Sequence, residues 1–264
     1  KNINKKSKEA FNVIYRSSSK DRNLAILNTS KIIKQEQKEI LKANKIDIEN
    51  AKRKQLNNAF VDRLLLDDKR IDNIVEGLKQ ISEMNDPIGV ELSKWTQPNG
   101  LNISKISVPL GIIGIIYESR PNVTIDAGSL CIKSGNTAIL RGGSDSINSS
   151  KILAKCMQKG LESANLPVNA VQLVENTDRD AVSAMLTSTG EIDIIIPRGG
   201  KSLVKKIQDE ARVPVFAHLE GICHIYVDKD ADINKAIKII INAKMRRTGI
   251  CGALETLLVD RDIS

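Results

Sequence analysis

The chain has 264 residues, enough for one large domain or two ordinary ones, and no stretch reaches the roughly 18 apolar residues of a membrane span. Its 40 basic and 32 acidic residues give a net charge of +8, which can attract nucleic acid, an anionic membrane or a small phosphorylated ligand. Aromatic residues are only 3%, too few for base-stacking platforms, and the lysines of residues 1–54 alternate with polar residues as on a solvated helix face. We therefore expect a small-molecule ligand, and neither a nucleic-acid nor a membrane partner.

Residues 1–85 place apolar side chains at helical spacing and are predicted to be helical. An Asp-Pro-Ile-Gly sequence at 86–89 ends this region. Two predicted strands, 90–95 and 102–108, then flank a Gln-Pro-Asn-Gly turn. This arrangement predicts a β-hairpin.

From residue 109 on, short apolar strands alternate with helices. The predicted strands are 112–116, 137–140, 170–174, 192–196, 213–217 and 224–227, and the helices between the first five are 124–132, 149–164, 179–187 and 201–210. Continuously apolar strands that alternate with helices are typical of a parallel sheet covered on both faces. The sequence therefore predicts an α/β fold with a doubly wound parallel sheet, which binds ligands at the carboxyl ends of its strands.

A last helix is predicted over 232–244, with Asp230 or Asp232 as its N-cap. A polar loop follows, and a strand is predicted over 254–259. The sequence stops soon afterwards without a closing helix. We therefore expect an incomplete second α/β domain.

The cysteines and histidines are too dispersed for a disulfide framework or a metal site. They are Cys131, Cys156, Cys223, Cys251, His218 and His224. The chain shows no Cys-x-x-Cys pair and no apolar signal core near its first residue, which favours reduced thiols in the cytoplasm. Cys223 and His224 are adjacent, but neighbouring residues on a strand point to opposite faces. We expect no metal, because no second cluster completes a four-ligand set.

Cys251 is the cysteine in a reactive setting. It follows a predicted helix on a polar loop and lies near the cations Lys244, Arg246 and Arg247. Nearby positive charge raises the thiolate fraction that a nucleophile needs. The alternative is a small buried apolar residue, which is the interpretation we favour for Cys131, Cys156 and Cys223.

Two Arg-Gly-Gly loops follow predicted strands, at 141–143 and 198–200. The second loop opens a helix, whose free N–H groups can bind an anion. Glycine lets a phosphate approach the backbone, and each arginine offers a charge-assisted hydrogen bond. A tight turn is the alternative for either loop. The G-x-G-x-x-G dinucleotide pattern is absent.

Residues 117–122 (YESRPN) end the first core strand. A polar amide at this position, Asn122, can donate a hydrogen bond to a developing oxyanion. Ordinary turn chemistry explains an Arg-Pro-Asn sequence equally well.

Five segments, taken in order, resemble the γ-glutamyl phosphate reductases (glutamate-5-semialdehyde dehydrogenases) of the aldehyde dehydrogenase superfamily. They are VPLGIIGIIYESRPN (108–122), GNTAILRGG (135–143), IDIIIPRGGKSL (192–203), GICHIYVD (221–228) and NAKMRRTGICGALETLLVD (242–260). The resemblance covers about 85–264, with a looser fit in the helical N-terminal region.

The resemblance implies NADPH-dependent reduction of L-glutamyl 5-phosphate to L-glutamate 5-semialdehyde and phosphate, the second step of proline synthesis from glutamate. Cys251 would attack the acyl phosphate and form a thioester, which NADPH would reduce. Asn122, with the backbone N–H of Cys251, would stabilise the oxyanion.

The resemblance also implies an NADPH-binding domain over 1–221, with an oligomerisation hairpin at about 90–107, and the start of a catalytic domain over 222–264, incomplete at its C-terminal end. The cofactor residues would be Arg141, Gly142, Gly143, Pro197, Arg198, Gly199 and Gly200, and Arg141 can favour the extra phosphate of NADPH. Candidates for the substrate's phosphate and α-carboxylate are Arg120, Lys244, Arg246 and Arg247. Unpaired hairpin edges fit a homodimer or a larger homo-oligomer.

Hydrolytic aldehyde dehydrogenases carry a glutamate base before the catalytic cysteine. The matching position here is His218, and Glu220 lies two residues away. The missing base favours the reductive direction, since a thioester that waits for hydride must not meet an activated water. The alternatives are another acyl reductase of the superfamily, the reductase half of a bifunctional pyrroline-carboxylate synthase, and a non-catalytic basic binding module.

Overall fold

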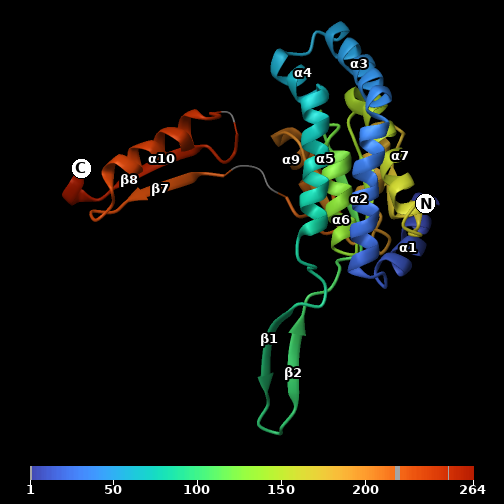
Figure 1. The fold of residues 1–264 in the computed structure, drawn as a ribbon, viewed down its shortest axis with the longest axis horizontal. Coiled ribbons are helices and arrows are strands. Elements are labelled where there is room, and N and C mark those ends of the chain that lie inside the picture. The colour runs from blue at the N-terminus through green and yellow to red at the C-terminus, as the bar shows by residue number, and fades with distance from the viewer. Residues whose placement is uncertain (1, 218–220, 249) are drawn as a thin grey trace. The chain divides into compact units, whose positions relative to one another are not determined.

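A computed structural model describes residues 2–217, 221–248 and 250–264. Contacts between Cα atoms divide the chain into two compact units, Lys1–Ala217 and His218–Ser264 (Figure 1). The sequence prediction divided the domains after residue 221. Across the described ranges, no helix combines the length and the apolar character that crossing a bilayer requires.

In the described part of unit 1, five helices precede the sheet, as the apolar spacing predicted. They are α1 (Asn2–Ile14), α2 (Ser19–Gln35), α3 (Gln37–Arg53), α4 (Asn58–Leu64) and α5 (Asp68–Glu83). Three of them begin at a capping side chain: Ser18, Asn57 and Asp67 each accept a hydrogen bond from the backbone N–H three residues later. α2 packs against α5 and against the later helix α7 (Ile147–Glu162).

The predicted hairpin is present: β1 (Glu91–Thr96) pairs antiparallel with β2 (Asn102–Ile106). Its turn contains Gly100 at a φ of +84°, a conformation that glycine adopts without strain. Every β1 residue is exposed, and among the described residues the two strands pair only with each other. Both outer edges of this ribbon are therefore open to a partner.

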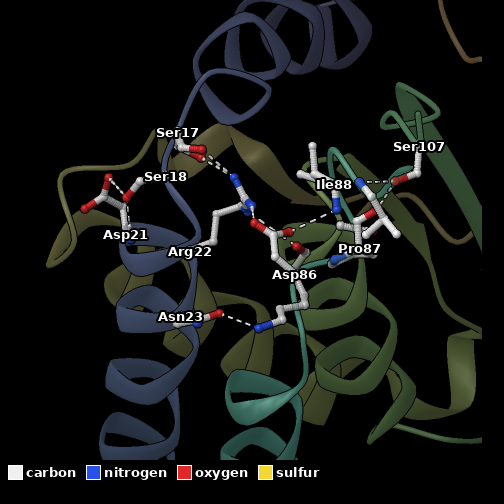
Figure 2. A network of polar contacts seen from close by, with 12 residues as sticks. Ser17, Ser18, Asp21, Arg22, Asn23, Asp86, Pro87, Ile88 and Ser107 are labelled. Atoms are coloured by element: carbon white, nitrogen blue, oxygen red, sulfur yellow. Dashed lines mark hydrogen bonds and ion pairs between the residues drawn. The ribbon is translucent and has the colours of Figure 1, made fainter. Parts of the chain in front are cut away.

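A buried ion pair fixes the base of the hairpin (Figure 2). Arg22 on α2 is only 2% exposed, and its Nη2 donates to Asp86 at 2.8 Å. Asp86 also accepts the N–H of Ile88 at 3.1 Å, and Ser107, beyond the other end of the hairpin, donates to the carbonyl of Pro87 at 2.5 Å. Because a buried guanidinium is stable only when paired and hydrogen-bonded, this contact ties both ends of the hairpin to α2.

The sheet of unit 1 has the strand order β5-β4-β3-β6, with all described strands parallel. Its strands are β3 (Ile112–Tyr117), β4 (Thr137–Arg141), β5 (Val171–Leu173) and β6 (Ile194–Arg198). The connecting helices are α6 (Val123–Lys133), α7, α8 (Arg179–Leu186) and α9 (Lys201–Glu210), with short 3₁₀ turns at η1 (Ser144–Ser146) and η2 (Val168–Ala170).

The two faces of this sheet carry separate cores. On β3, Ile113 and Ile115 pack into a cluster with residues of α2, α5, α6 and α7. Their neighbours Ile112 and Ile116 pack into a second cluster with residues of α8 and α9. Successive strand residues point to opposite faces, so both faces are covered, and the predicted doubly wound α/β fold is confirmed.

The predicted strand 213–217 is wrong. Only Val215 in this segment forms a bridge, with Ile195 of β6. Pro214 has no N–H to extend a ladder, although its carbonyl accepts the N–H of Ile195 at 2.8 Å. The strand predicted from residue 170 begins one residue later, because 168–170 form the turn η2.

Unit 2 is a single β-α-β arrangement within its described residues. β7 (Cys223–Val227) pairs in parallel with β8 (Leu254–Val259), and α10 (Ile233–Met245) connects them; the short turn η3 (Arg261–Ile263) follows. Of the two candidate N-caps, Asp232 caps α10 and accepts the N–H of Lys235 at 3.1 Å. None of the residues of α10 is buried, as expected for an incomplete second domain.

Candidate active site

Three of the predicted site segments meet at one edge of the unit 1 sheet. β3 lies between β4 and β6, and Ile116 of β3 is in register with Arg141 of β4. Tyr117 is in register with Arg198 of β6. The carboxyl ends of these strands therefore bring residues 117–122 together with both Arg-Gly-Gly loops, which is where doubly wound sheets bind ligands.

Arg141 is half-buried, and one of its donors is buried without a partner. Its Nη2 donates to the carbonyl of Thr177 at 2.7 Å, whereas its buried Nε has no hydrogen-bond partner among the described residues. A buried donor without an acceptor is costly, so an acceptor group of a ligand at this position would be stabilising. Gly142 follows, and a Cβ there would lie 3.1 Å from the ring of Tyr117, so the loop packs closely on β3.

The second Arg-Gly-Gly loop, residues 198–200, binds a carboxylate of the same chain. The N–H of Gly200, just before α9, donates to Oε2 of Glu118 at 3.0 Å. A Cβ on Gly199 would lie 2.6 Å from the same oxygen and 2.6 Å from Cδ2 of Leu203, so a larger residue there would displace these two side chains. Sequence reasoning missed Glu118. The available signal was its position at the end of a predicted core strand.

A cavity of about 540 Å³ lies between these loops. Its polar lining includes Glu118, Arg141, Ser144, Thr177, Ser202 and Lys206. The lining carries two cations, Arg141 and Lys206, and two carboxylates, Glu118 and Asp145. Asp145 is paired with Lys54 at 2.7 Å, and Lys206 lies 3.7 Å from Glu210. Arg141 and the hydroxyls of Ser144, Thr177 and Ser202 are the donors that a phosphate-bearing cofactor can use. The residues present therefore fit a nucleotide, although the Glu118 carboxylate competes for the N–H of Gly200.

Asn122 is the N-cap residue of α6, but its side chain does not cap the helix. Its Nδ2 donates instead to Oδ2 of Asp126, one turn later, at 2.8 Å. Burial raises the pKa of Asp126, and this hydrogen bond partly offsets the rise. One Nδ2 hydrogen holds the amide in place, and the other remains for a ligand. Asn122 also borders a cavity of about 600 Å³, together with Arg120 and Arg198.

The proposed nucleophile lies in unit 2. Cys251 is exposed, and its carbonyl lies 3.4 Å from the Cys223 thiol. Lys244, Arg246 and Arg247 are also exposed, and in the described parts of the chain no hydrogen bond or ion pair joins them to Cys251. The pairing of Cys251 with Asn122 connects the two units and stays a prediction. The proposed base position, His218, and Glu220 lie outside the described residues.

Two of the remaining thiols are buried. Burial raises the pKa of Cys131 to about 12, and burial together with the charge of Glu36 raises the pKa of Cys156 to about 11. Both stay protonated at neutral pH and out of reach of a substrate. Over the described ranges, no group of three or more His, Cys, Asp or Glu side chains is placed to hold a metal ion.

Comparison with known proteins gives one family. A sequence model described as "Aldehyde dehydrogenase family" matches residues 1–264. The chain is 53% identical over 263 residues to the γ-glutamyl phosphate reductase of Brucella suis, which covers 99% of this chain and 62% of that protein. The chain spans about three fifths of the length of the curated relatives it matches.

Two solved structures, both of proteins named γ-glutamyl phosphate reductase, have the same fold. That of Thermotoga maritima is 42% identical, with a TM-score of 0.91 over 99% of this chain and 63% of that one. That of Saccharomyces cerevisiae is 34% identical, with a TM-score of 0.77 over 100% of this chain and 66% of that one.

Proposed function

The chain belongs to the aldehyde dehydrogenase family, and from this premise we propose that the complete protein reduces L-glutamyl 5-phosphate to L-glutamate 5-semialdehyde with NADPH. Phosphate is released, and the reaction is the second step of proline synthesis from glutamate. The observation that carries the proposal is the 53% identity, along 99% of the chain, to a protein named γ-glutamyl phosphate reductase. The reduced thiols expected of this chain favour the cytoplasm as its location.

Cys251 is the nucleophile in this proposal. It is exposed, whereas burial keeps Cys131 and Cys156 protonated and inaccessible. The Cys251 thiolate attacks the acyl carbon, the bond from carbon to the phosphate oxygen breaks, and phosphate leaves with that electron pair. A thioester remains on Sγ. Hydride for its reduction is the chemistry that NADPH supplies when bound.

Asn122 is the oxyanion donor in this proposal. Its amide is already oriented by the 2.8 Å hydrogen bond to Asp126, and its second Nδ2 hydrogen is available. A donor that is fixed before the reaction stabilises developing negative charge without reorganising, typically by about 3 kcal/mol. The backbone N–H of Cys251 is the second donor that we assign to the oxyanion.

The 540 Å³ cavity at the strand ends is the proposed cofactor site. Arg141 through its unused Nε, with Gly142 and Gly143, and the segment Pro197–Gly200 are the residues that we assign to NADPH. Arg141 and Lys206 offer positive charge for the extra phosphate that distinguishes NADPH from NADH. For the substrate's phosphate and α-carboxylate the candidates predicted from the sequence are Arg120, Lys244, Arg246 and Arg247.

We further propose that the complete protein is a homo-oligomer that pairs through the hairpin. Leu92, Trp95 and Ile106 expose 58%, 44% and 53% of their surface, and both ribbon edges lack a partner strand in the described chain. Light scattering on the complete protein, with and without residues 91–106, tests this assignment. If the variant without the hairpin forms an oligomer with the same number of subunits, the hairpin is not the interface.

The reverse reaction tests the function. Glutamate 5-semialdehyde, NADP⁺ and phosphate are supplied to the complete protein, and NADPH is followed by absorbance. We expect NADPH formation that requires phosphate and disappears in Cys251→Ala, while Cys156→Ala retains it. Turnover that ignores phosphate would identify a hydrolytic dehydrogenase and overturn the acyl-phosphate assignment.

A further inference from the structure

A second, smaller cavity lies beside Asn122, on the side facing the N-terminal helices. Its volume is about 270 Å³, near the lower end of the roughly 300–1,000 Å³ typical of small-molecule sites. Its polar lining comes from three helices: Arg63 of α4, Arg70 and Asn73 of α5, and Asn122 with Asp126 at the start of α6. The cavity therefore places charged groups of both signs next to the proposed oxyanion donor.

Arg70 is not available to a ligand. Its Nη1 donates to the carbonyls of Asp62 and Leu65, the latter at 2.9 Å, and its Nη2 pairs with the Asp62 carboxylate at 2.6 Å. These bonds join the first turn of α5 to α4 and to the loop between them. Arg70 thereby supports the cavity wall. A ligand in the cavity must be bound by the other lining residues.

Arg63 lies on a helix whose two ends are fixed by hydrogen bonds, and its own side chain is unpaired. Asn57 caps α4 through the N–H of Phe60 at 2.8 Å. Asn44 of α3 donates to the carbonyl of Leu64 at 2.8 Å, at the other end of α4. The Arg63 guanidinium itself makes no hydrogen bond or ion pair to any residue in the described ranges. The Arg63 side chain is exposed, lines the cavity and has free donors.

Asp126 is the opposite charge in the same cavity. Its Oδ2 accepts from Asn122 at 2.8 Å, and no second hydrogen bond to this carboxylate is seen in the described chain. An inorganic phosphate or another dianion would be repelled by this carboxylate. A ligand that carries one carboxylate and one ammonium group matches both Arg63 and Asp126.

We propose that this cavity binds the α-amino-acid head of the substrate, with the α-carboxylate on Arg63 and Asn73 and the α-ammonium group on Asp126. This inference rests on the proposed function and names the part of the substrate that the cavity selects. The short side chain of glutamate then leads from the cavity to Asn122, where the oxyanion forms. In this arrangement Asp126 contacts both the ammonium group and Asn122, which places the substrate head directly beside the oxyanion donor that Asp126 already orients.

The test compares two aldehydes in the reverse reaction of the complete protein: glutamate 5-semialdehyde and 5-oxopentanoate, which lacks the amino group. For Arg63→Gln we expect the KM for glutamate 5-semialdehyde to rise about tenfold, the loss typical of one charge-assisted hydrogen-bonded contact, and Arg63→Lys to recover part of it. The kcat and the KM for NADP⁺ stay within about twofold in this variant. Lys69→Gln removes an exposed cation of α5 outside the cavity and is the matched control.

Asp126→Asn is expected to reduce the preference for glutamate 5-semialdehyde over 5-oxopentanoate about tenfold, because only the aminated aldehyde loses a contact. Unfolding midpoints equal to that of the unchanged protein exclude misfolding as the cause. An unchanged KM in Arg63→Gln, or an unchanged preference in Asp126→Asn, overturns the inference and leaves the proposed function standing. No turnover of either aldehyde by the unchanged protein overturns the function and the inference together.

Discussion

The Asp47 carboxylate of α3 caps α7 from outside that helix. Its Oδ2 accepts the backbone N–H of Ser149 at 2.8 Å and the Ser149 hydroxyl at 2.6 Å. Its Oδ1 accepts the N–H of Asn148 at 3.2 Å, and Ser146, the residue in the N-cap position, makes no capping bond. The helix that follows the Arg141–Gly143 loop therefore begins where α3 fixes it.

Asp47→Ala is expected to lower the free energy of unfolding by about 3 kcal/mol, since it leaves buried N–H groups of α7 without an acceptor. Equilibrium urea unfolding followed by circular dichroism measures the change. The control is Lys54→Ala, which removes the more exposed pair between α3 and Asp145 and is expected to change stability by less than about 1 kcal/mol. Equal losses in both variants would contradict the capping role of Asp47.

Gly160→Ala is expected to destabilise unit 1 although alanine favours helices. At position 160 of α7 a Cβ would lie 2.0 Å from the Thr29 hydroxyl and 2.9 Å from the carbonyl of Ala25, both on α2. A helix gains about 1 kcal/mol from such a change, but forcing packed backbones apart costs about 1–3 kcal/mol. Since backbone atoms cannot rotate away, we expect the packing cost to exceed the helix gain, with a net loss of up to about 2 kcal/mol in urea unfolding.

Gly77→Ala, in contrast, is expected to stabilise unit 1. A Cβ at this position of α5 meets nothing within 4 Å, so only helix propensity changes. We expect a gain of about 0.5–1 kcal/mol in the same unfolding measurement. Stabilisation in both glycine variants would show that α2 and α7 pack less closely at position 160 than described.

Thiol labelling separates the cysteines by exposure. At neutral pH, iodoacetamide is expected to modify Cys251 first and Cys223, which is partly buried, more slowly. Cys131 and Cys156 are buried and should be modified only after unfolding in urea. Peptide mass spectrometry over a time course measures the four rates. Labelling of Cys156 as fast as Cys251 in the folded protein would contradict the buried position of Cys156.

Much of the fold follows from local sequence patterns. The apolar runs at β3, β4 and β6 predict a buried parallel sheet because their residues face a core on both sides. The segment 213–217 has the same composition but only one bridge, because Pro214 cannot donate to a ladder. Strand composition alone does not report whether a neighbouring strand is available.

The contacts that shape the site are less accessible to sequence reasoning. Arg63 and Asp47 are distant in sequence from the elements beside which they lie. Arg63 lines a cavity with the start of α6, and Asp47 caps α7. Each belongs to a helix whose charged residues resemble an ordinary solvated face. The packing of α3 against α7, of α5 against α6 and of α4 against α3 gives these two charges a role. The strand-end segments were predictable because parallel strands bring their carboxyl ends together.

The stability of the protein is expected to fall as pH rises above about 9, because two buried thiols resist ionisation. An unfolded thiol titrates near its ordinary pKa of 9.0, whereas burial raises the pKa of Cys131 to about 12 and that of Cys156 to about 11. Between these values the unfolded chain releases protons that the folded chain keeps, so alkali favours unfolding. Each thiol contributes a slope of up to about 1.4 kcal/mol per pH unit.

The ionisation of Lys133 makes the folded state more stable as pH rises, in contrast to the two thiols. Burial, together with the charge of Arg22, lowers its pKa from the ordinary 10.5, although Asp86 partly offsets this. The folded chain therefore loses the Lys133 proton before the unfolded chain does, and this group stabilises the fold as pH rises toward 10.5. Urea unfolding at pH 8, 9 and 10 in the presence of a reductant measures the net slope. We expect it to be negative, since two thiols oppose one amine.

The double variant Cys131→Ala/Cys156→Ala isolates the thiols. Its stability at pH 8 is lower because two small cavities form, but its stability should fall less steeply with pH, since the two buried thiols no longer oppose Lys133. Cys251→Ala, at an exposed position, is the matched control and should keep the original slope. A double variant whose slope stays as negative as that of the unchanged protein would assign the alkaline loss to other groups, with Tyr117, whose pKa burial also raises, the first to test.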